Sequence, residues 1–282
     1  MKRAIENTRR SAPGKDGICY TMIKHLCEGG LTKILSLFNK VWKEGKVPRS
    51  WKEAIIIPIR KLGKDHSMTI NYRPIALTSH IGKIMERMIN ERLMYYIEKR
   101  GLVTRYQSGF RRGRSTMHPV VCLEDDIRKA QVNKETVAAV FFDVEKAYDM
   151  LWREGLLIKM HRMGIEGNMF NWTMDFLRER VIQVRIGSEV SESYMVENGT
   201  PQGSVISPTL FTIMINDIFD SIPAGMGRSL FADDGALWKR GGNIDHTVKK
   251  LQEGIDQVEK WGEEWGFKFS VEKSNVLLKK EN

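Results

Sequence analysis

Three aspartates in the second half of the chain stand where apolar segments end or turn. Asp143 follows the run TVAAVFF, and the pair Asp233 and Asp234 lies at the centre of LFADDGALW. A carboxylate that is partly withdrawn from water is unfavourable unless another group or a cation compensates its charge. Two hard cations about 4 Å apart, held by such carboxylates, can activate a hydroxyl and stabilise a leaving oxygen in phosphoryl transfer. The three residues are therefore candidate ligands for two Mg²⁺ ions, with Mn²⁺ as an alternative.

An ordinary hairpin turn competes with this interpretation. Aspartate is common in turns, so Asp233 and Asp234 taken alone are explained equally well without any chemistry. Asp143 favours the metal site, because it is far from the pair in sequence and ends a second apolar segment. The joint pattern predicts that two strand ends bring the three carboxylates together.

The elements that must position these residues follow from hydrophobic periodicity. The segment 136–144 is β-branched and aromatic, which is typical of a central strand, and 228–238 is typical of a hairpin with the Asp pair at its turn. Apolar residues at helical spacing predict helices over 20–42, 81–97, 153–163, 167–180, 207–222 and 244–265. Further strands are expected at 54–59, 181–187, 193–198 and 267–271. The expected fold class is α+β, with a split βαβ, ferredoxin-like antiparallel sheet and helices on one of its faces.

Charge is distributed unevenly along the 282 residues. Residues 1–132 contain 27 Lys and Arg against 12 Asp and Glu, whereas residues 133–282 contain 18 against 23. A basic half suits a polyanion, because each neutralised phosphate releases condensed counterions. The loop QSGFRRGRST places Arg111, Arg112 and Arg114 between glycines, where they are candidate phosphate contacts. A solvated basic surface remains the alternative, since charge alone is a weak signal of nucleic-acid binding.

Other features of the sequence limit the compartment and the class of protein. Cys19, Cys27 and Cys122 are odd in number and lack CxxC spacing, so we expect free thiols rather than a disulfide framework or a zinc site. No stretch of 18 apolar residues occurs, and the polar, basic N-terminus lacks a signal-peptide core. We expect an intracellular protein, in the nucleus or the cytoplasm, without a membrane partner.

The sequence resembles the reverse transcriptases of non-LTR (LINE-type) retrotransposons, particularly the jockey-like group. The resemblance rests on segments that occur in the family's order along nearly the whole chain: SAPGKDGI (11–18), NYRPIALTS (71–79), QSGFRRGRST (107–116), FFDVEKAYD (141–149), NGTPQGSVISP (198–208), LFADDGALW (230–238) and WGFKFSVEKS (265–274). It implies an RNA-directed DNA polymerase with a right-hand architecture. It also implies an RNA template, a DNA primer or target, and dNTPs as partners.

The resemblance assigns metal ligands residue by residue. Asp143 matches the first metal-binding aspartate, and the main-chain carbonyl of Val144 matches a further ligand. Asp233 matches the second metal-binding aspartate. Asp234 is less regularly a direct ligand in such enzymes, so its role is expected to be mainly electrostatic.

The resemblance also implies nucleotide contacts. Tyr148 matches the steric gate that excludes a ribose 2′-hydroxyl, with a packed core aromatic as the alternative role. Gln202 and Gly203 match the segment that lines the nucleotide and template pocket, where glycine permits close backbone approach. Arg73 matches an arginine that grips the triphosphate, a role suited to a bidentate donor. Lys61 is a weaker candidate for that role, and Lys273 matches a lysine that assists the pyrophosphate.

Two departures from the family pattern bear on activity. Phe231 stands where the family most often has tyrosine before Ala-Asp-Asp, and its ring can still pack under the hairpin. The sequence ends soon after the Lys273 segment, so a thumb, an endonuclease and a C-terminal domain are not expected in it. We expect residues 1–132 to form mainly the fingers and residues 133–282 mainly the palm. The alternatives are a truncated, inactive remnant that binds nucleic acid, and a group II intron-type or RNA polymerase relative.

Overall fold

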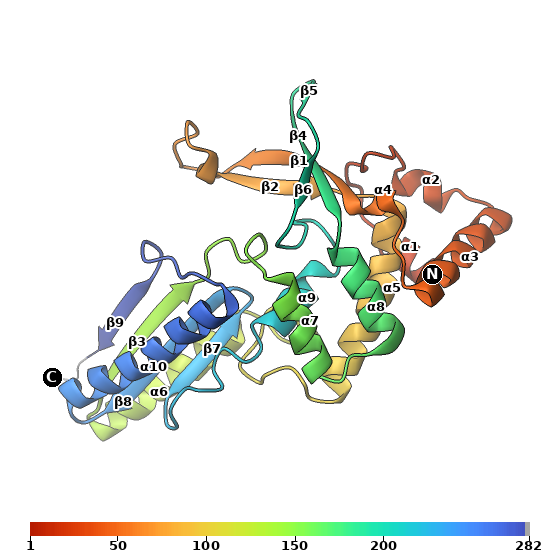
Figure 1. Cartoon of the computed structure of the whole chain (residues 1–282). Helices are drawn as coiled ribbons and strands as arrows, with labels where there is room; N and C mark the ends of the chain where they lie inside the picture. Colours follow the sequence, from red (N-terminus) through yellow and green to blue (C-terminus); the bar gives the residue numbers. More distant parts are fainter. Residues whose placement is uncertain (280–282) are drawn as a thin grey trace. The chain divides into compact units, whose positions relative to one another are not determined.

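A computed structural model describes residues 1–279, which form two compact units. Unit 1 combines residues 1–100 with 156–207, and unit 2 combines 101–155 with 208–282. Each unit is therefore built from two separate stretches of chain (Figure 1). The expected division at residue 132 concerns functional subdomains, and it stays a prediction. The units are described separately below.

Unit 1 contains a mixed sheet of five strands and most of the N-terminal helices. Its sheet has the order β2-β1-β4-β5, and β6 also pairs with β4. β1 is antiparallel to β2 and parallel to β4. The strands are β1 (Glu53–Arg60), β2 (Tyr72–Leu77), β4 (Arg180–Ile186), β5 (Glu189–Val190) and β6 (Tyr194–Val196). The helices are α1 (Lys2–Glu6), α2 (Tyr20–Lys24), α3 (Glu28–Glu44), α4 (Arg49–Lys52), the 3₁₀ turn η1 (Thr69–Asn71), α5 (His80–Lys99), most of α7 (Arg153–Arg162) and α8 (Gly167–Leu177).

Unit 2 is built on an antiparallel sheet with the order β7-β8-β3-β9. The strands are β3 (Thr136–Asp143), β7 (Gly227–Phe231), β8 (Asp234–Gly241) and β9 (Asn275–Lys279), and the helices are α6 (Met117–Asn133), α9 (Ser207–Met214) and α10 (Ile244–Trp265). Taken in chain order β3-α9-β7-β8-α10-β9, with the residues between β3 and α9 set aside, this is the β-α-β-β-α-β succession of a ferredoxin-like sheet. The antiparallel ferredoxin-like sheet expected from the sequence is therefore present.

Helices cover both faces of this sheet, whereas the sequence analysis placed them on one face. Successive residues of a strand point to opposite faces. Leu237 approaches α10 at Gly254, while the indole of its neighbour Trp238 donates to Asp126 of α6 over 2.7 Å. Figure 1 shows α10 and α6 on either side of the sheet. The difference arises from α6, which the sequence analysis did not identify.

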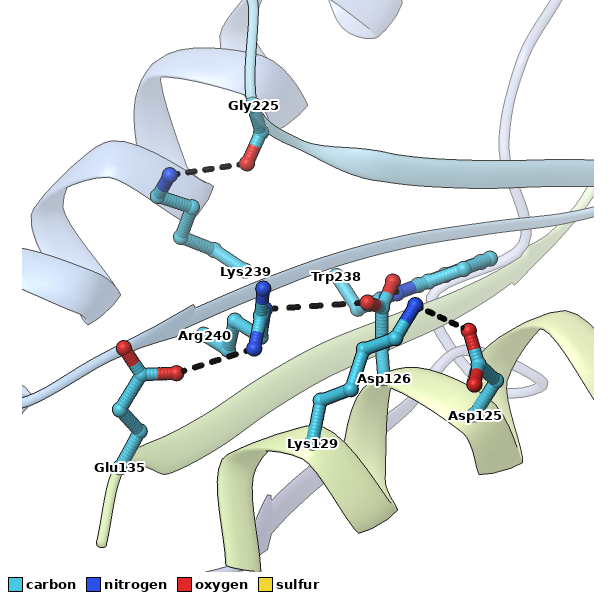
Figure 2. Close-up of polar contacts among 8 residues, drawn as sticks. All are labelled: Asp125, Asp126, Lys129, Glu135, Gly225, Trp238, Lys239 and Arg240. Carbon is cyan, nitrogen blue, oxygen red and sulfur yellow. Dashed lines mark hydrogen bonds and ion pairs between the residues drawn. The ribbon is translucent and has the colours of Figure 1, made fainter. Parts of the chain in front are cut away.

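Polar contacts hold α6 to the strands (Figure 2). Besides the bond from Trp238, Arg240 of β8 lies 3.7 Å from Asp126 and 3.3 Å from Glu135, which precedes β3. Trp238 is 2% exposed, so its N–H group depends on a protein acceptor. These contacts fix the face of the sheet that lies opposite α10.

α10, with 22 residues, is the longest helix in residues 1–279, and its ends have identifiable signals. Asn243 caps its first turn by accepting from the His246 amide at 2.9 Å, and Gly266 ends it with a φ of 76°. An Asx N-cap and a left-handed glycine after the last turn are the usual helix boundaries. The expected span of 244–265 is confirmed.

Most other expected elements are present with shifts of a few residues at their ends, but three differ. The helix expected over 20–42 is divided into α2 (Tyr20–Lys24) and α3 (Glu28–Glu44). The helix expected over 207–222 ends at Met214. The strand expected at 267–271 is reduced to one bridge, between Val144 and Phe269, and the last strand lies instead at Asn275–Lys279.

In residues 1–279, no helix combines the length and the apolar character needed to cross a lipid bilayer.

Candidate active site

Backbone register brings two of the three aspartates together. Asp143 ends β3 and Asp234 begins β8, and these two residues are Cα partners in the antiparallel ladder. Directly opposed residues of such a pair have neighbouring side chains on one face. Asp233 occupies the turn between β7 and β8, and its carbonyl accepts from the Val144 amide at 3.4 Å. The structure therefore gathers the predicted metal ligands Asp143, Val144, Asp233 and Asp234 at one end of the sheet.

The carboxylates are electrostatically coupled. Burial raises the pKa of Asp233, and the charges of Asp234 and Asp143 raise this pKa further. Burial and then repulsion from Asp143 raise the pKa of Asp234, although much of this side chain is exposed. In both cases Lys273 acts in the opposite direction and lowers the pKa. Positive charge at this position is therefore stabilising, as expected for a cation site.

Lys273 supplies one such charge. Its ammonium donates to Asp143 Oδ2 over 2.7 Å. The segment that carries it is fastened to the end of β3, because the Ser270 amide donates to the Asp143 carbonyl at 2.9 Å. The predicted placement of Lys273 beside the aspartates is thus observed in the geometry.

A divalent cation would suit this group of donors. Carboxylate and carbonyl oxygens are the ligands that Mg²⁺ and Mn²⁺ prefer. Burial, followed by repulsion from neighbouring carboxylates, raises the pKa values of Asp233 and Asp234. Within residues 1–279, no cluster of three or more His, Cys, Asp or Glu side chains is already arranged in a metal-binding geometry. Mg²⁺ commonly keeps several waters and takes further ligands from substrate phosphates, so a protein need not supply the full set.

Tyr148 lies next to this group. Its ring packs against Phe211 with centroids 5.5 Å apart. Burial, followed by the charge of Asp233, raises the pKa of its hydroxyl to about 12. Tyr148 is thus a partly buried, neutral aromatic beside the predicted ligands, which is compatible with both the gate role and the packing role.

The turn that carries Asp233 is held by a residue that the sequence analysis did not single out. The amide of Gln107 accepts from the Ala232 N–H at 3.0 Å and donates to the Ala232 carbonyl at 3.2 Å. Gln107 is 1% exposed. It begins the QSGFRRGRST segment, so the first part of that segment packs on the hairpin instead of forming an open loop.

The three arginines of the same segment differ in their surroundings. Arg111 donates to the carbonyls of Thr104 and Gln107, and Arg114 donates to the carbonyl of Arg105 at 2.6 Å. Both therefore help to shape the loop. Arg112 is exposed, which makes it the member of the trio best placed to meet a phosphate.

A pocket of about 580 Å³ adjoins the aspartates within unit 2. Its lining is mostly apolar and includes Phe141, Phe231 and Leu123, together with Asp143 and Asp234. Of the three aspartates, Asp143 and Asp234 line this pocket and Asp233 does not.

Unit 1 carries a second group of predicted site residues. Arg73 lies on β2, opposite Ile59 of β1, and is exposed. Lys61 follows β1, and its ammonium donates to the Ile70 carbonyl at 2.9 Å. Lys61 is thus engaged in the loop between the two strands, whereas Arg73 projects from the strand itself.

Gln202 and Gly203 are joined to the same strand. The Ala76 amide donates to the Gln202 carbonyl at 2.7 Å. Gly203 has a φ of 123°, and a Cβ there would come within 2.8 Å of the Ala76 carbonyl oxygen. Glycine is therefore required both by conformation and by space.

Glu86 of α5 supports this turn. It is 4% exposed, and its Oε2 accepts from Ser204 Oγ at 2.5 Å and from the Val205 amide at 2.7 Å. The helical pattern around 81–97 gave no signal for this role, because the partners lie far away in sequence.

Comparisons with known proteins agree with these observations. The sequence profile described as "Reverse transcriptase (RNA-dependent DNA polymerase)" matches residues 59–282. The RNA-directed DNA polymerase from mobile element jockey of Drosophila melanogaster is 31% identical over 276 residues, which cover 95% of this chain and 30% of that protein. A probable RNA-directed DNA polymerase from transposon X-element of the same species is 30% identical, covering 96% and 30%. The chain thus spans about 30% of the length of these relatives.

Solved structures show the same fold at low sequence identity. Apo telomerase from Candida Tropicalis, truncated from its C-terminal domain, matches with a TM-score of 0.59 and 16% identity, covering 89% of this chain and 55% of that one. Telomerase from Candida albicans with a TWJ fragment of telomeric RNA matches with a TM-score of 0.57 and 13% identity, covering 86% and 45%. The expected polymerase fold and the resemblance to non-LTR retrotransposon enzymes are both confirmed, and the chain belongs to the reverse transcriptase (RNA-dependent DNA polymerase) family.

Proposed function

We propose that this chain is the catalytic core of a non-LTR retrotransposon reverse transcriptase, and that it extends a primer with dNTPs on an RNA template. In the reaction, the primer 3′-hydroxyl loses its proton to solvent and its oxygen bonds to the α-phosphorus of the dNTP. The bond to the β-phosphate breaks, and pyrophosphate leaves with the displaced electron pair. The observation that carries the proposal is the meeting of Asp143, Asp233 and Asp234 at one end of a ferredoxin-like sheet.

Asp143, Asp233 and the carbonyl of Val144 would hold two divalent cations, Mg²⁺ or Mn²⁺, with Asp234 contributing mainly through its charge. When bound, such ions supply activation of the hydroxyl and neutralisation of the phosphate charge. The reverse transcriptase family generally uses divalent metal ions. Burial and then the neighbouring carboxylates raise the pKa values of Asp233 and Asp234, which supports the proposal because a bound cation would favour the ionised forms.

The remaining residues bind and select the nucleotide in this proposal. Arg73 grips the triphosphate with its fork of donors, supported by Lys61, and Lys273 assists the leaving pyrophosphate. Gln202 and Gly203 line the nucleotide and template pocket. Tyr148 abuts the sugar and excludes a 2′-hydroxyl, which selects dNTPs over rNTPs.

Nucleic acid is held by the basic first half of the chain. Arg112 contacts the phosphate backbone directly, and Arg111 and Arg114 contribute charge while they shape the same loop. The partners are an RNA template and a DNA primer or target, and the site of action is the nucleus or the cytoplasm.

The central test is primer extension on an RNA template with dNTPs and Mg²⁺. Asp233→Ala should abolish extension, because the turn loses its metal-binding carboxylate. Asp256→Ala is the matched control, since Asp256 is an exposed aspartate on α10 of the same unit that accepts from Gln252. It should leave the rate unchanged.

The outcomes separate the competing functions. Extension that requires Asp233 and tolerates Asp256→Ala supports the polymerase. A chain that binds RNA in a salt-sensitive manner but extends no primer would be a nucleic-acid-binding remnant, and the enzymatic proposal would be wrong for it. Efficient use of rNTPs in place of dNTPs would instead indicate an RNA polymerase.

A further inference from the structure

The turn between β7 and β8 has an unusual backbone. Phe231 pairs with Asp234, so Ala232 and Asp233 form a two-residue hairpin loop. Ala232 has a φ of 58°, while Asp233 is absent from the residues with positive φ. A positive φ at the first loop residue alone is the pattern of a type II′ turn, in which that position is normally glycine. An alanine there is strained, so the conformation needs support from outside the hairpin.

The segment 106–109 provides that support. The Leu230 amide donates to the Tyr106 carbonyl and the Ser108 amide donates to the Leu230 carbonyl, both at 2.9 Å. Residues 106–108 therefore lie along β7 as a short parallel bridge centred on Gln107 and Leu230. This places the Gln107 side chain at the tip of the hairpin.

The Gln107 amide contacts both polar groups of the strained residue. Its Oε1 accepts from the Ala232 N–H at 3.0 Å and from the Gly109 N–H at 2.7 Å, and its Nε2 donates to the Ala232 carbonyl at 3.2 Å. Gly109 itself lies so close that a Cβ would come within 2.2 Å of the Ala232 nitrogen. Buried hydrogen bonds of this kind fix a backbone, because breaking them would leave unsatisfied polar groups.

We propose that Gln107, with Gly109, is a positioning residue for the active site: it holds Ala232 in its strained conformation and so aims the Asp233 and Asp234 carboxylates. This inference rests on the proposed function for its catalytic consequence. The structural part, the restraint of the turn, is independent of it. Gln107 contacts no reacting atom and acts through the backbone of the turn.

Hydrogen–deuterium exchange tests the structural part on the 282-residue chain. Gln107→Met preserves the length of the side chain but removes its amide. The Ala232 amide should then exchange at least about tenfold faster, because its acceptor is gone. Amides in the middle of β8 should keep their protection. Thr247→Val is the control, since it removes a buried hydrogen bond, to the Asn243 carbonyl at 2.7 Å, at the start of α10.

Primer extension tests the catalytic part. Gln107→Met should lower kcat at least about tenfold while the KM for dNTP changes less than about threefold, because the predicted triphosphate contacts are untouched. Gly109→Ala should have the same effect by pushing on the turn. Gly242→Ala is its control, since a Cβ there meets no atom within 4 Å. Thr247→Val and Gly242→Ala should retain kcat within about twofold.

Three results would overturn the inference. The first is unchanged exchange at Ala232 in Gln107→Met. The second is a kcat in Gln107→Met close to that of the unmodified chain. The third is an equal loss of kcat in Thr247→Val, which would indicate general destabilisation. If the unmodified chain extends no primer, the proposed function fails, and the exchange experiment still decides whether Gln107 restrains the turn.

Discussion

Asp233 is a predicted metal ligand, and its ionised carboxylate also destabilises the folded chain. Its folded-state pKa is raised above the ordinary value of 3.8, first by burial and then by the neighbouring acids. A group with a raised folded pKa favours folding below its unfolded pKa, and this contribution is lost as the pH rises through the folded pKa. The ionised site therefore weakens the fold at neutral pH when no cation is present.

Asp233→Asn should consequently stabilise the chain at pH 7 in the presence of EDTA, while it removes catalysis. The difference in free energy of unfolding between the variant and the unmodified chain should shrink as the pH falls below about 4, because Asp233 then becomes protonated and is neutral like the asparagine. Urea denaturation at pH 7 and at pH 3.5 measures this difference. An equal difference at the two pH values would show that ionisation of Asp233 is not the cause.

Substitution of Tyr148 tests how the chain selects the sugar of the nucleotide. Tyr148→Ala should let the chain incorporate rNTPs, because removing the ring opens space beside the predicted ligands. Tyr148→Phe should keep the discrimination, since the packing against Phe211 depends on the ring and not on the hydroxyl. The ratio of kcat/KM for dNTP and rNTP measures the effect. If Tyr148→Ala discriminates as well as the unmodified chain, Tyr148 is a packing residue only.

Among the elements, the β7-β8 hairpin depends on close packing at its open end. A Cβ at Gly227 would lie 1.9 Å from the Trp238 ring. Gly227→Ala should therefore displace the indole from Asp126 and destabilise the chain by about 1–3 kcal/mol. Chemical denaturation measures the change. Gly242→Ala, in open space after β8, should change stability by less than about 1 kcal/mol. Equal effects of the two substitutions would contradict the packing argument.

The elements also show which parts of the fold can be predicted from sequence. β3, the hairpin and α10 were predictable, because each has strong periodicity and its own boundary signals. α6 was not, since Ala130 is its only buried residue and its apolar pattern is correspondingly weak. β9 has an apolar core, NVLL, but every residue in it is exposed and it pairs on one side with β3.

Some residues of the candidate site could also be predicted from the sequence, and others could not. The aspartates, Lys273, Arg73 and the Gln202-Gly203 turn were found through motifs. Gln107 and Glu86 were missed in their actual roles, because their partners are more than a hundred positions away along the chain. Local sequence patterns do not reveal such contacts, because only the tertiary fold brings these distant residues together.

For the whole molecule, the basic first half predicts salt-dependent binding. The logarithm of the association constant for RNA should fall linearly with the logarithm of salt concentration. Arg112→Ala should reduce the slope by about 1, as expected for the loss of one phosphate contact. Lys249→Ala is the control, because Lys249 is an exposed cation on α10 in the second half. Fluorescence anisotropy with labelled RNA measures both slopes. Identical slopes for the two variants would mean that Arg112 has no specific contact.

Because each unit is built from two separate stretches of chain, recombination between related genes affects the two units unequally. A genetic crossover between two diverged copies of this gene joins the front of one to the back of the other. Any breakpoint between residues 101 and 207 leaves both units with parts from different parents, whereas an earlier or later breakpoint mixes only one unit. Core packing tolerates mismatched partners poorly. Viable chimeras should therefore have their junctions before residue 101 or after residue 207, so that residues 101–207 are inherited from one parent.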